Sequence, residues 1–121
     1  MGSKTILVVE DDISLREVFV MMIEMDGHKA IEAENGKHAL EILGHTDKRP
    51  DCILLDLMMP IMDGKTFIQN IKTMEAHNDI PIIVCSAQGD FETTPQVYTR
   101  MDKPVDLNVL GQTIKECLKL S

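Results

Sequence analysis

Five short apolar segments recur along the whole chain. The first, Ile6-Leu7-Val8-Val9, is rich in β-branched residues and lacks the polar alternation of a strand that faces water on one side. A continuous run of this kind is typical of a strand that is buried on both faces of a sheet. Similar runs predict further strands at 29–33, 52–55, 80–85 and, with the poorest pattern, 97–101.

Helical patterns separate these strands. One stripe of apolar residues runs along segment 14–25, and its members are Leu15, Val18, Phe19, Met22 and Met25. Their spacing is that of a surface helix with one buried face, and Gly27 is placed to end it. Segments 38–43, 65–74 and 106–120 repeat the helical pattern.

Strands that alternate with helices at short intervals imply right-handed crossovers and a parallel sheet covered on both faces. We therefore predict a doubly wound α/β fold, with residues 1–121 forming one domain. In such a sheet, ligands bind at the carboxyl ends of the strands, where the strand order reverses.

The chemistry-bearing residues follow the predicted strands. Glu10, Asp11 and Asp12 come after the first strand, Asp56 after the third, Ser86 after the fourth, and Lys103 before the last helix. Carboxylates gathered this closely repel one another and are tolerated mainly around a cation. Because the set offers oxygen ligands without His or Cys, Mg²⁺ fits better than Zn²⁺.

Asp56 is the candidate nucleophile. A carboxylate fixed at a strand end can attack phosphorus when a metal ion neutralises the oxygens that it approaches. Lys103 would place an ammonium group against one phosphoryl oxygen, and the Ser86 hydroxyl would donate a hydrogen bond to another.

Four motifs together resemble the receiver domains of two-component response regulators. They stand in the right order along the whole chain: Ile6 to Asp12, Asp56-Leu57-Met58-Met59-Pro60-Ile61-Met62-Asp63-Gly64, Ser86-Ala87 and Lys103-Pro104. The resemblance implies a flavodoxin-like sheet in the order 2-1-3-4-5, an aspartyl phosphate at Asp56 and Mg²⁺ as cofactor.

The resemblance also implies the role of each site residue. Asp11, Asp56 and the backbone carbonyl of Met58 would coordinate Mg²⁺ directly, and Glu10 would reach it through water. Lys103-Pro104 matches the family's cis peptide bond, which proline makes accessible. Asp12 is better explained as a cap of the first helix, or as a shield of the site, than as a ligand, because Asp is favoured before helices.

The chain departs from the family between Ser86 and Lys103, which are only 17 residues apart. The segment 88–95 contains Gly, Pro and two Thr, so the family's fourth helix is expected to be shortened or missing. Arg100 occupies the position of the usual switch aromatic. Tyr98 shares a face with Arg100 if the strand is regular and is a candidate substitute, although core packing or exposure is the simpler interpretation.

The predicted function is a phosphoacceptor switch that takes its phosphoryl group from a phosphohistidine on a histidine kinase or phosphotransfer protein. It would signal to a downstream protein target as a monomer or weak dimer, and would catalyse only its own phosphorylation and dephosphorylation. The sequence leaves open a stand-alone switch, a relay component or a piece of a longer regulator. A degenerate receiver that binds a partner without phosphorylation remains an alternative. A haloacid-dehalogenase-type enzyme is disfavoured because Met58 stands where its second Asp is required.

Composition narrows the partners and the location. The formal net charge of −8 argues against direct binding to nucleic acid. No apolar run approaches the roughly 20 residues needed to cross a bilayer, and no secretory signal opens the chain. We therefore expect a cytoplasmic protein that does not associate with membranes.

Overall fold

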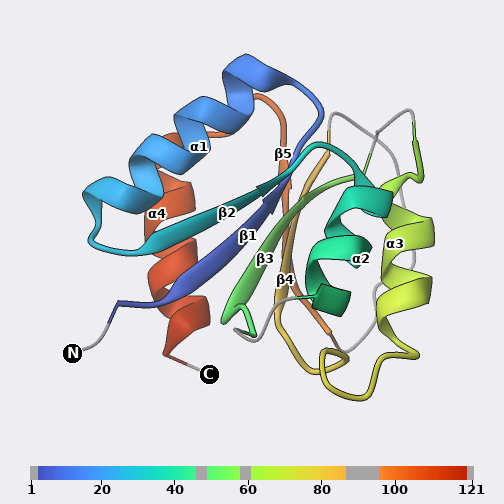
Figure 1. Cartoon of the computed structure of the whole chain (residues 1–121). Helices are drawn as coiled ribbons and strands as arrows, with labels where there is room; N and C mark the ends of the chain where they lie inside the picture. The colour runs from blue at the N-terminus through green and yellow to red at the C-terminus, as the bar shows by residue number, and fades with distance from the viewer. Residues whose placement is uncertain (1–2, 46–48, 58–60, 87–95, 120–121) are drawn as a thin grey trace.

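Five parallel strands form one sheet in the order β2-β1-β3-β4-β5 (Figure 1). Their bounds are β1 Thr5–Val9, β2 Lys29–Ala33, β3 Cys52–Asp56, β4 Ile82–Ser86 and β5 Val97–Asp102. This computed structural model describes residues 3–45, 49–57, 61–86 and 96–119. The predicted fold class and strand order are confirmed, and the segment 97–101, poor as a strand in its sequence, does form one.

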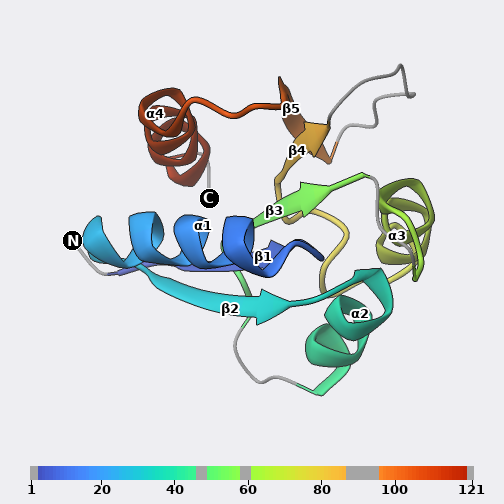
Figure 2. The same ribbon diagram turned by 90° about the horizontal axis from the view of Figure 1, so that it is seen from above.

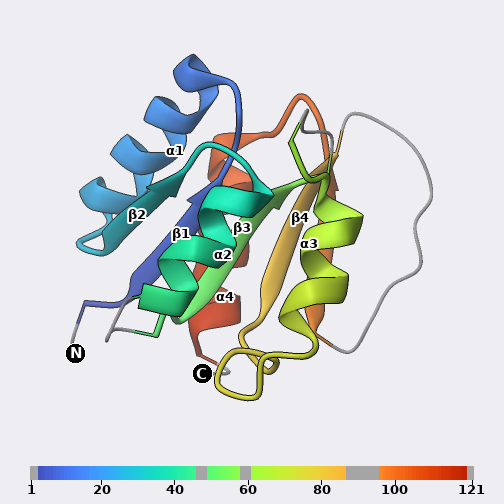
Figure 3. The same cartoon turned by 45° about the vertical axis from the view of Figure 1, so that its right-hand side comes forward.

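Four helices cover the two faces of the sheet in the described residues. They are α1 Ile13–Met25, α2 Gly36–His45, α3 Gly64–Ile71 and α4 Leu107–Leu118. Seen from above, α1 and α4 lie on one side of the sheet and α2 and α3 on the other (Figure 2). Figure 3 shows α2 and α3 next to each other on the same face of the sheet. The helix labelled α4 is the one that follows β5. The segment 88–95, where the family's fourth helix was predicted to be shortened or missing, falls outside the described residues.

The sheet alternates its side chains between two apolar clusters. Ile6, Val8 and Leu54 pack toward α1 and α4, whereas their neighbours Leu7 and Val9 pack toward α2 and α3. Both sets are almost completely buried. The three central strands therefore contact core on both faces, which explains why their sequences show no alternation of apolar and polar residues.

Strand β5 contains a bulge that corrects one sequence-based expectation. Ile82 pairs with Val97 but Ile83 pairs with Thr99, so Tyr98 is an extra residue in the ladder. The bulge places Tyr98 among the side chains that pack toward α1 and α4, while Arg100 pairs with Val84, whose side chain faces α2 and α3. The expectation that Tyr98 and Arg100 share a face is therefore wrong, because it assumed an uninterrupted pleat.

Aspartates cap three of the helices. Asp12 accepts a hydrogen bond from the backbone N–H of Leu15 at the start of α1, Asp63 from Thr66 in α3, and Asp106 from residues in the first turn of α4. The helix-capping interpretation of Asp12 agrees with this contact. Gly27, with a φ of 85°, follows the end of α1 and takes the left-handed conformation that glycine adopts most readily.

The Asp63 cap gives a pH-dependent prediction. Its hydrogen bonds with Thr66 lower the pKa of Asp63 below the ordinary value of 3.8. Because the folded-state pKa is the lower one, the stabilisation is present above pH 3.8 and is lost as the pH falls through the folded-state pKa. Asp63→Ala should lower the free energy of unfolding by about 1 kcal/mol near neutral pH, whereas Asp63→Asn should retain most of the cap. Urea unfolding between about pH 6 and pH 3 tests this. A wild-type-to-Ala difference that stays constant down to pH 3 would contradict it.

Gly64 opens α3 at a point of close backbone approach. A Cβ atom there would lie 2.7 Å from Leu57 Cα and 3.0 Å from the Asp56 carbonyl oxygen. The Gly64 backbone N–H also donates to the Leu57 carbonyl oxygen at 2.9 Å. The start of α3 is thus held directly against the end of β3.

Gly64→Ala is therefore expected to destabilise the protein by about 1–3 kcal/mol, because backbone rather than a flexible side chain must move. Gly44→Ala in α2 is the matched control, since a Cβ atom there meets nothing within 4 Å. That control should be neutral or stabilising by up to about 1 kcal/mol, as expected for alanine in a helix. Urea denaturation compares the two variants, and equal effects would contradict the close approach at Gly64.

Candidate functional site

Three carboxylates meet at the carboxyl ends of the strands. Asp56 is the last residue of β3, and Glu10 and Asp11 directly follow β1, which pairs with β3. One carboxylate oxygen from each of the three residues lies within 4.8 Å of the others. Glu10 and Asp56 are buried, whereas Asp11 is exposed. The structure thus brings together the three acidic side chains that the sequence placed at one edge of the sheet.

Lys103 supplies a positive charge to this cluster. Its Nζ atom lies 3.2 Å from Glu10 Oε1 and 3.4 Å from Asp56 Oδ2. The peptide bond between Lys103 and Pro104 is cis, the isomer that the family resemblance implies. Although partial burial by itself lowers the pKa of Lys103, the two carboxylates raise it above its ordinary value. Lys103 is therefore held as a cation between Glu10 and Asp56.

The pKa of Glu10 lies above its ordinary value of 4.5. Burial raises the pKa of Glu10 to about 7, and repulsion from Asp56 adds to this effect. The Asp12 backbone N–H, which donates to Glu10 Oε2 at 3.1 Å, and the Lys103 ammonium group act in the opposite direction. Three carboxyl groups thus gather beside one ammonium group, and a bound cation would relieve the repulsion between them.

The donor set fits a magnesium ion. Mg²⁺ takes oxygen ligands at roughly 2.0–2.1 Å, so two ligands on opposite sides of one ion stand about 4 Å apart. Carboxylate oxygens that all lie within 4.8 Å of one another can reach such an ion with small rotamer adjustments. The cluster contains no sulfur or imidazole ligand, which argues against zinc.

The remaining predicted site residues are described less completely. Ser86 ends β4 and pairs with Asp102. Met58, predicted to offer its backbone carbonyl oxygen, lies outside the described residues. Tyr98 packs against the buried cluster that includes Ile83 and Leu110, on the side of the sheet opposite to the one that Arg100 faces.

Arg16 was not predicted from the sequence. Its Nη1 atom donates to the Glu10 carbonyl oxygen at 2.8 Å, and its Nε atom donates to Glu32 Oε1 at 3.1 Å. These contacts tie the first turn of α1 to the segment that carries Glu10. The sequence signal was weak, because a single basic residue near a helix start usually faces solvent.

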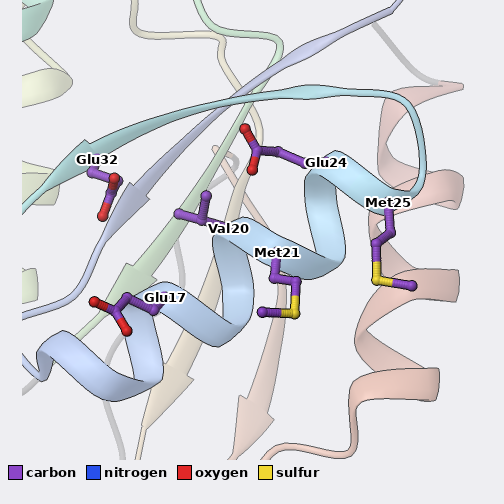
Figure 4. A pocket seen from close by; sticks show the side chains of 6 residues that line it. All are labelled: Glu17, Val20, Met21, Glu24, Met25 and Glu32. Carbon is purple, nitrogen blue, oxygen red and sulfur yellow. The ribbon is translucent and has the colours of Figure 1, made fainter.

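A separate groove lies along the outer side of α1, near β2 (Figure 4). Its volume is about 450 Å³, and it is lined by Glu17, Val20, Met21, Glu24, Met25 and Glu32. None of these residues belongs to the acidic cluster. None of the helices in the described residues has the length and the apolar composition that a membrane span requires.

Comparison with known proteins agrees with this geometry. The family model for the response regulator receiver domain matches residues 6–115. The sporulation initiation phosphotransferase F of Bacillus subtilis is 29% identical over 125 aligned positions, which cover 99% of this chain and 98% of that protein. The phosphate regulon transcriptional regulatory protein PhoB of Pseudomonas aeruginosa is 40% identical over 90 residues. That match covers 74% of this chain but only 38% of PhoB.

Solved structures show the same fold. The signal receiver domain of a signal transduction histidine kinase from Syntrophus aciditrophicus superposes with a TM-score of 0.85 at 28% identity, covering 97% of this chain and 91% of that one. The chemotaxis response regulator CheY4 of Vibrio cholerae gives 0.82 at 23% identity, covering 96% and 99%. Because the family model spans nearly the whole chain and the acidic cluster stands where the fold places its ligands, the chain belongs to the response regulator receiver domain family.

Proposed function

We propose that this domain accepts a phosphoryl group on Asp56 in a two-component or phosphorelay system. The observation that carries the proposal is the grouping of Asp56 with two further carboxylates, within 4.8 Å, and with the Lys103 ammonium group at 3.4 Å. A carboxylate fixed by a buried strand and faced by a cation combines a rigid nucleophile with a stabiliser of developing charge.

In the proposed transfer, a carboxylate oxygen of Asp56 forms a bond to phosphorus while the bond from phosphorus to the donor's histidine nitrogen breaks. The nitrogen keeps the electron pair, and an acyl phosphate remains on Asp56. Lys103 lies close enough to Asp56 to pair with an oxygen of that phosphoryl group. We assign Ser86, at the end of β4, the hydrogen bond to another oxygen. Hydrolysis of the acyl phosphate returns the domain to its starting state.

Asp11 and Asp56 would hold Mg²⁺ directly, with Glu10 acting through water and the Met58 carbonyl completing the protein ligands. When bound, Mg²⁺ neutralises the carboxylates and the phosphoryl oxygens that approach them. Glu10 also has a role of its own, because it accepts a hydrogen bond from Lys103 and so positions the ammonium group beside Asp56.

The relatives support a phosphohistidine donor on a histidine kinase or phosphotransfer protein. Besides the sporulation phosphotransferase, the sensor kinase CckA of Brucella abortus is 31% identical over 123 aligned positions, which cover 98% of this chain but only 13% of the kinase. We infer a cytoplasmic protein, a monomer or weak dimer, that acts on a protein target and catalyses no reaction beyond its own phosphorylation and dephosphorylation. Ser86 and Tyr98 are the proposed switch residues. In this chain Tyr98 would act through the α4 side, where it packs.

Incubation with acetyl phosphate tests this function. The wild-type protein with Mg²⁺ should gain about 80 Da, one phosphoryl group, in intact mass, and EDTA should prevent the gain. In parallel, the melting temperature is measured at increasing Mg²⁺ concentrations, because a rise in the melting temperature reports metal binding independently of phosphoryl transfer. If neither a mass gain nor Mg²⁺ binding occurs, the domain is a receiver that binds partners without phosphorylation. The intact cluster of Glu10, Asp11, Asp56 and Lys103 argues against that alternative.

A further inference from the structure

Two of the three cysteines touch in the core on the side of α1 and α4. Cys52 begins β3, Cys117 lies in the last turn of α4, and their Sγ atoms are 3.7 Å apart. Both side chains are fully buried, and both thiols are free. The two residues are 65 positions apart in the chain, so only the folded structure brings the sulfurs into contact.

We propose that Cys52 and Cys117 form an oxidisable dithiol pair, which a peroxide closes reversibly into a disulfide bond that ties α4 to β3. A disulfide bond needs the sulfurs at about 2.05 Å, so they must approach each other by less than about 2 Å in total. We expect rotation about the side-chain torsions, with a small shift of α4, to close that distance. The inference is independent of the proposed function, because neither cysteine belongs to the phosphoacceptor site.

The chemistry needs only the two thiols and a two-electron oxidant. The thiolate of Cys117 attacks one oxygen of hydrogen peroxide, the O–O bond breaks, and a sulfenic acid and hydroxide form. The Cys52 sulfur then displaces the sulfenic oxygen, which leaves as water with the thiol proton. In sum, two thiols and one peroxide give one disulfide and two waters, and a dithiol reductant reverses the change.

Cys117 is the better first nucleophile of the pair. Contact with Cys52 lowers the pKa of the Cys117 thiol, whereas the same contact and burial raise the pKa of Cys52. Cys117 also lies in the last turn of its helix, and helix ends open locally far more often than central strands such as β3. Opening of that turn exposes Cys117 to a small oxidant while Cys52 stays in place.

Cys85 provides an internal comparison. It is buried in the same apolar cluster, and burial raises the pKa of its thiol to about 12. No sulfur contact of Cys85 is seen among the described residues. Cys85 is therefore expected to stay reduced under conditions that oxidise the pair.

The whole folded chain is treated with hydrogen peroxide, and its intact mass is measured. Free thiols are then blocked, and the protein is digested without reduction to map disulfide-linked peptides. We expect a loss of about 2 Da in intact mass, reversed by dithiothreitol, and a single linkage between Cys52 and Cys117. Cys52→Ala and Cys117→Ala should each abolish the loss, and Cys85→Ala should leave it unchanged. The oxidised protein should melt roughly 5 °C or more above the reduced one, because the crosslink restricts the unfolded chain.

Oxidation in guanidinium chloride controls for unfolding. Cys85 is 33 residues from Cys52 and 32 from Cys117, so loop closure in an unfolded chain favours either of these pairings over the longer loop. Selective linkage of Cys52 to Cys117 in the folded protein, with mixed linkages in denaturant, supports the proposal. The same mixture under both conditions, no disulfide in the folded protein, or oxidation that survives Cys117→Ala would overturn it.

Discussion

Asp56→Asn is expected to abolish phosphoryl uptake while stabilising the metal-free protein. Asparagine preserves the shape of the side chain but has no anionic oxygen to form the acyl phosphate. It also removes one of the carboxylates that crowd the cluster, where repulsion from Asp56 helps to raise the pKa of Glu10. Lys103 keeps Glu10 as a partner in the variant. The free energy of unfolding should rise by roughly 1 kcal/mol without Mg²⁺, because the variant lacks the repulsion between the Asp56 carboxylate and its acidic neighbours.

Intact mass after acetyl phosphate treatment and urea unfolding in EDTA measure the two effects. Asp79→Asn is the matched control, because Asp79 is an exposed carboxylate that pairs with Arg49 on the surface. Phosphoryl uptake should be unchanged in the control, and stability should change by less than about 1 kcal/mol. A full mass gain in Asp56→Asn would show that another residue accepts the group.

Lys103→Met is expected to have the opposite effect on stability. Methionine keeps much of the apolar stem but removes the charge that faces Glu10 and Asp56. Losing one partner of a buried ion pair costs about 3–5 kcal/mol, and the partial exposure of Lys103 should reduce this to roughly 1–3 kcal/mol in the metal-free protein. The rate of phosphoryl uptake should fall by about 10²–10³-fold, the usual loss for one preorganised stabilising group.

The time course of phosphorylation with Mg²⁺ measures this loss against Lys37→Met, a matched control at an exposed position in α2. The control should behave as wild type in both rate and stability. Opposite signs in the metal-free stability of Asp56→Asn and Lys103→Met would identify one electrostatically crowded cluster. A Lys103→Met protein that accepts phosphoryl groups at the wild-type rate would remove Lys103 from the mechanism.

The sequence predicted the fold well, because buried parallel strands and amphipathic helices carry strong local signals. It also predicted the edge where Glu10, Asp11, Asp56 and Lys103 meet, since the carboxyl ends of parallel strands lie together. Element boundaries were less accurate. The predicted third helix ran to residue 74, for example, whereas α3 ends at Ile71.

The features that the sequence missed depend on tertiary contacts. The predicted stripe of α1 included Met25, which is 80% exposed, and omitted Ile23, which is 1% exposed. Periodicity cannot fix the rotation of a helix when apolar residues also occur outside the buried face. The bulge at Tyr98 is a feature of the pairing between β4 and β5, and no glycine or other turn residue at that position indicates it in the sequence. Likewise, the contact of Arg16 with the Glu10 carbonyl group depends on how α1 sits against β1.

Locating the phosphoryl group on the chain tests the central claim most directly. The phosphorylated wild-type protein is treated with borohydride, which reduces the acyl phosphate carbon to an alcohol, and the digested peptides are sequenced by mass spectrometry. An Asp56 phosphate is predicted to leave homoserine at position 56, a mass about 14 Da below that of aspartate, only when both Mg²⁺ and acetyl phosphate were present. Reduction at Glu10 or Asp11, or at no residue of the cluster, would contradict the assignment of Asp56 as the phosphoacceptor.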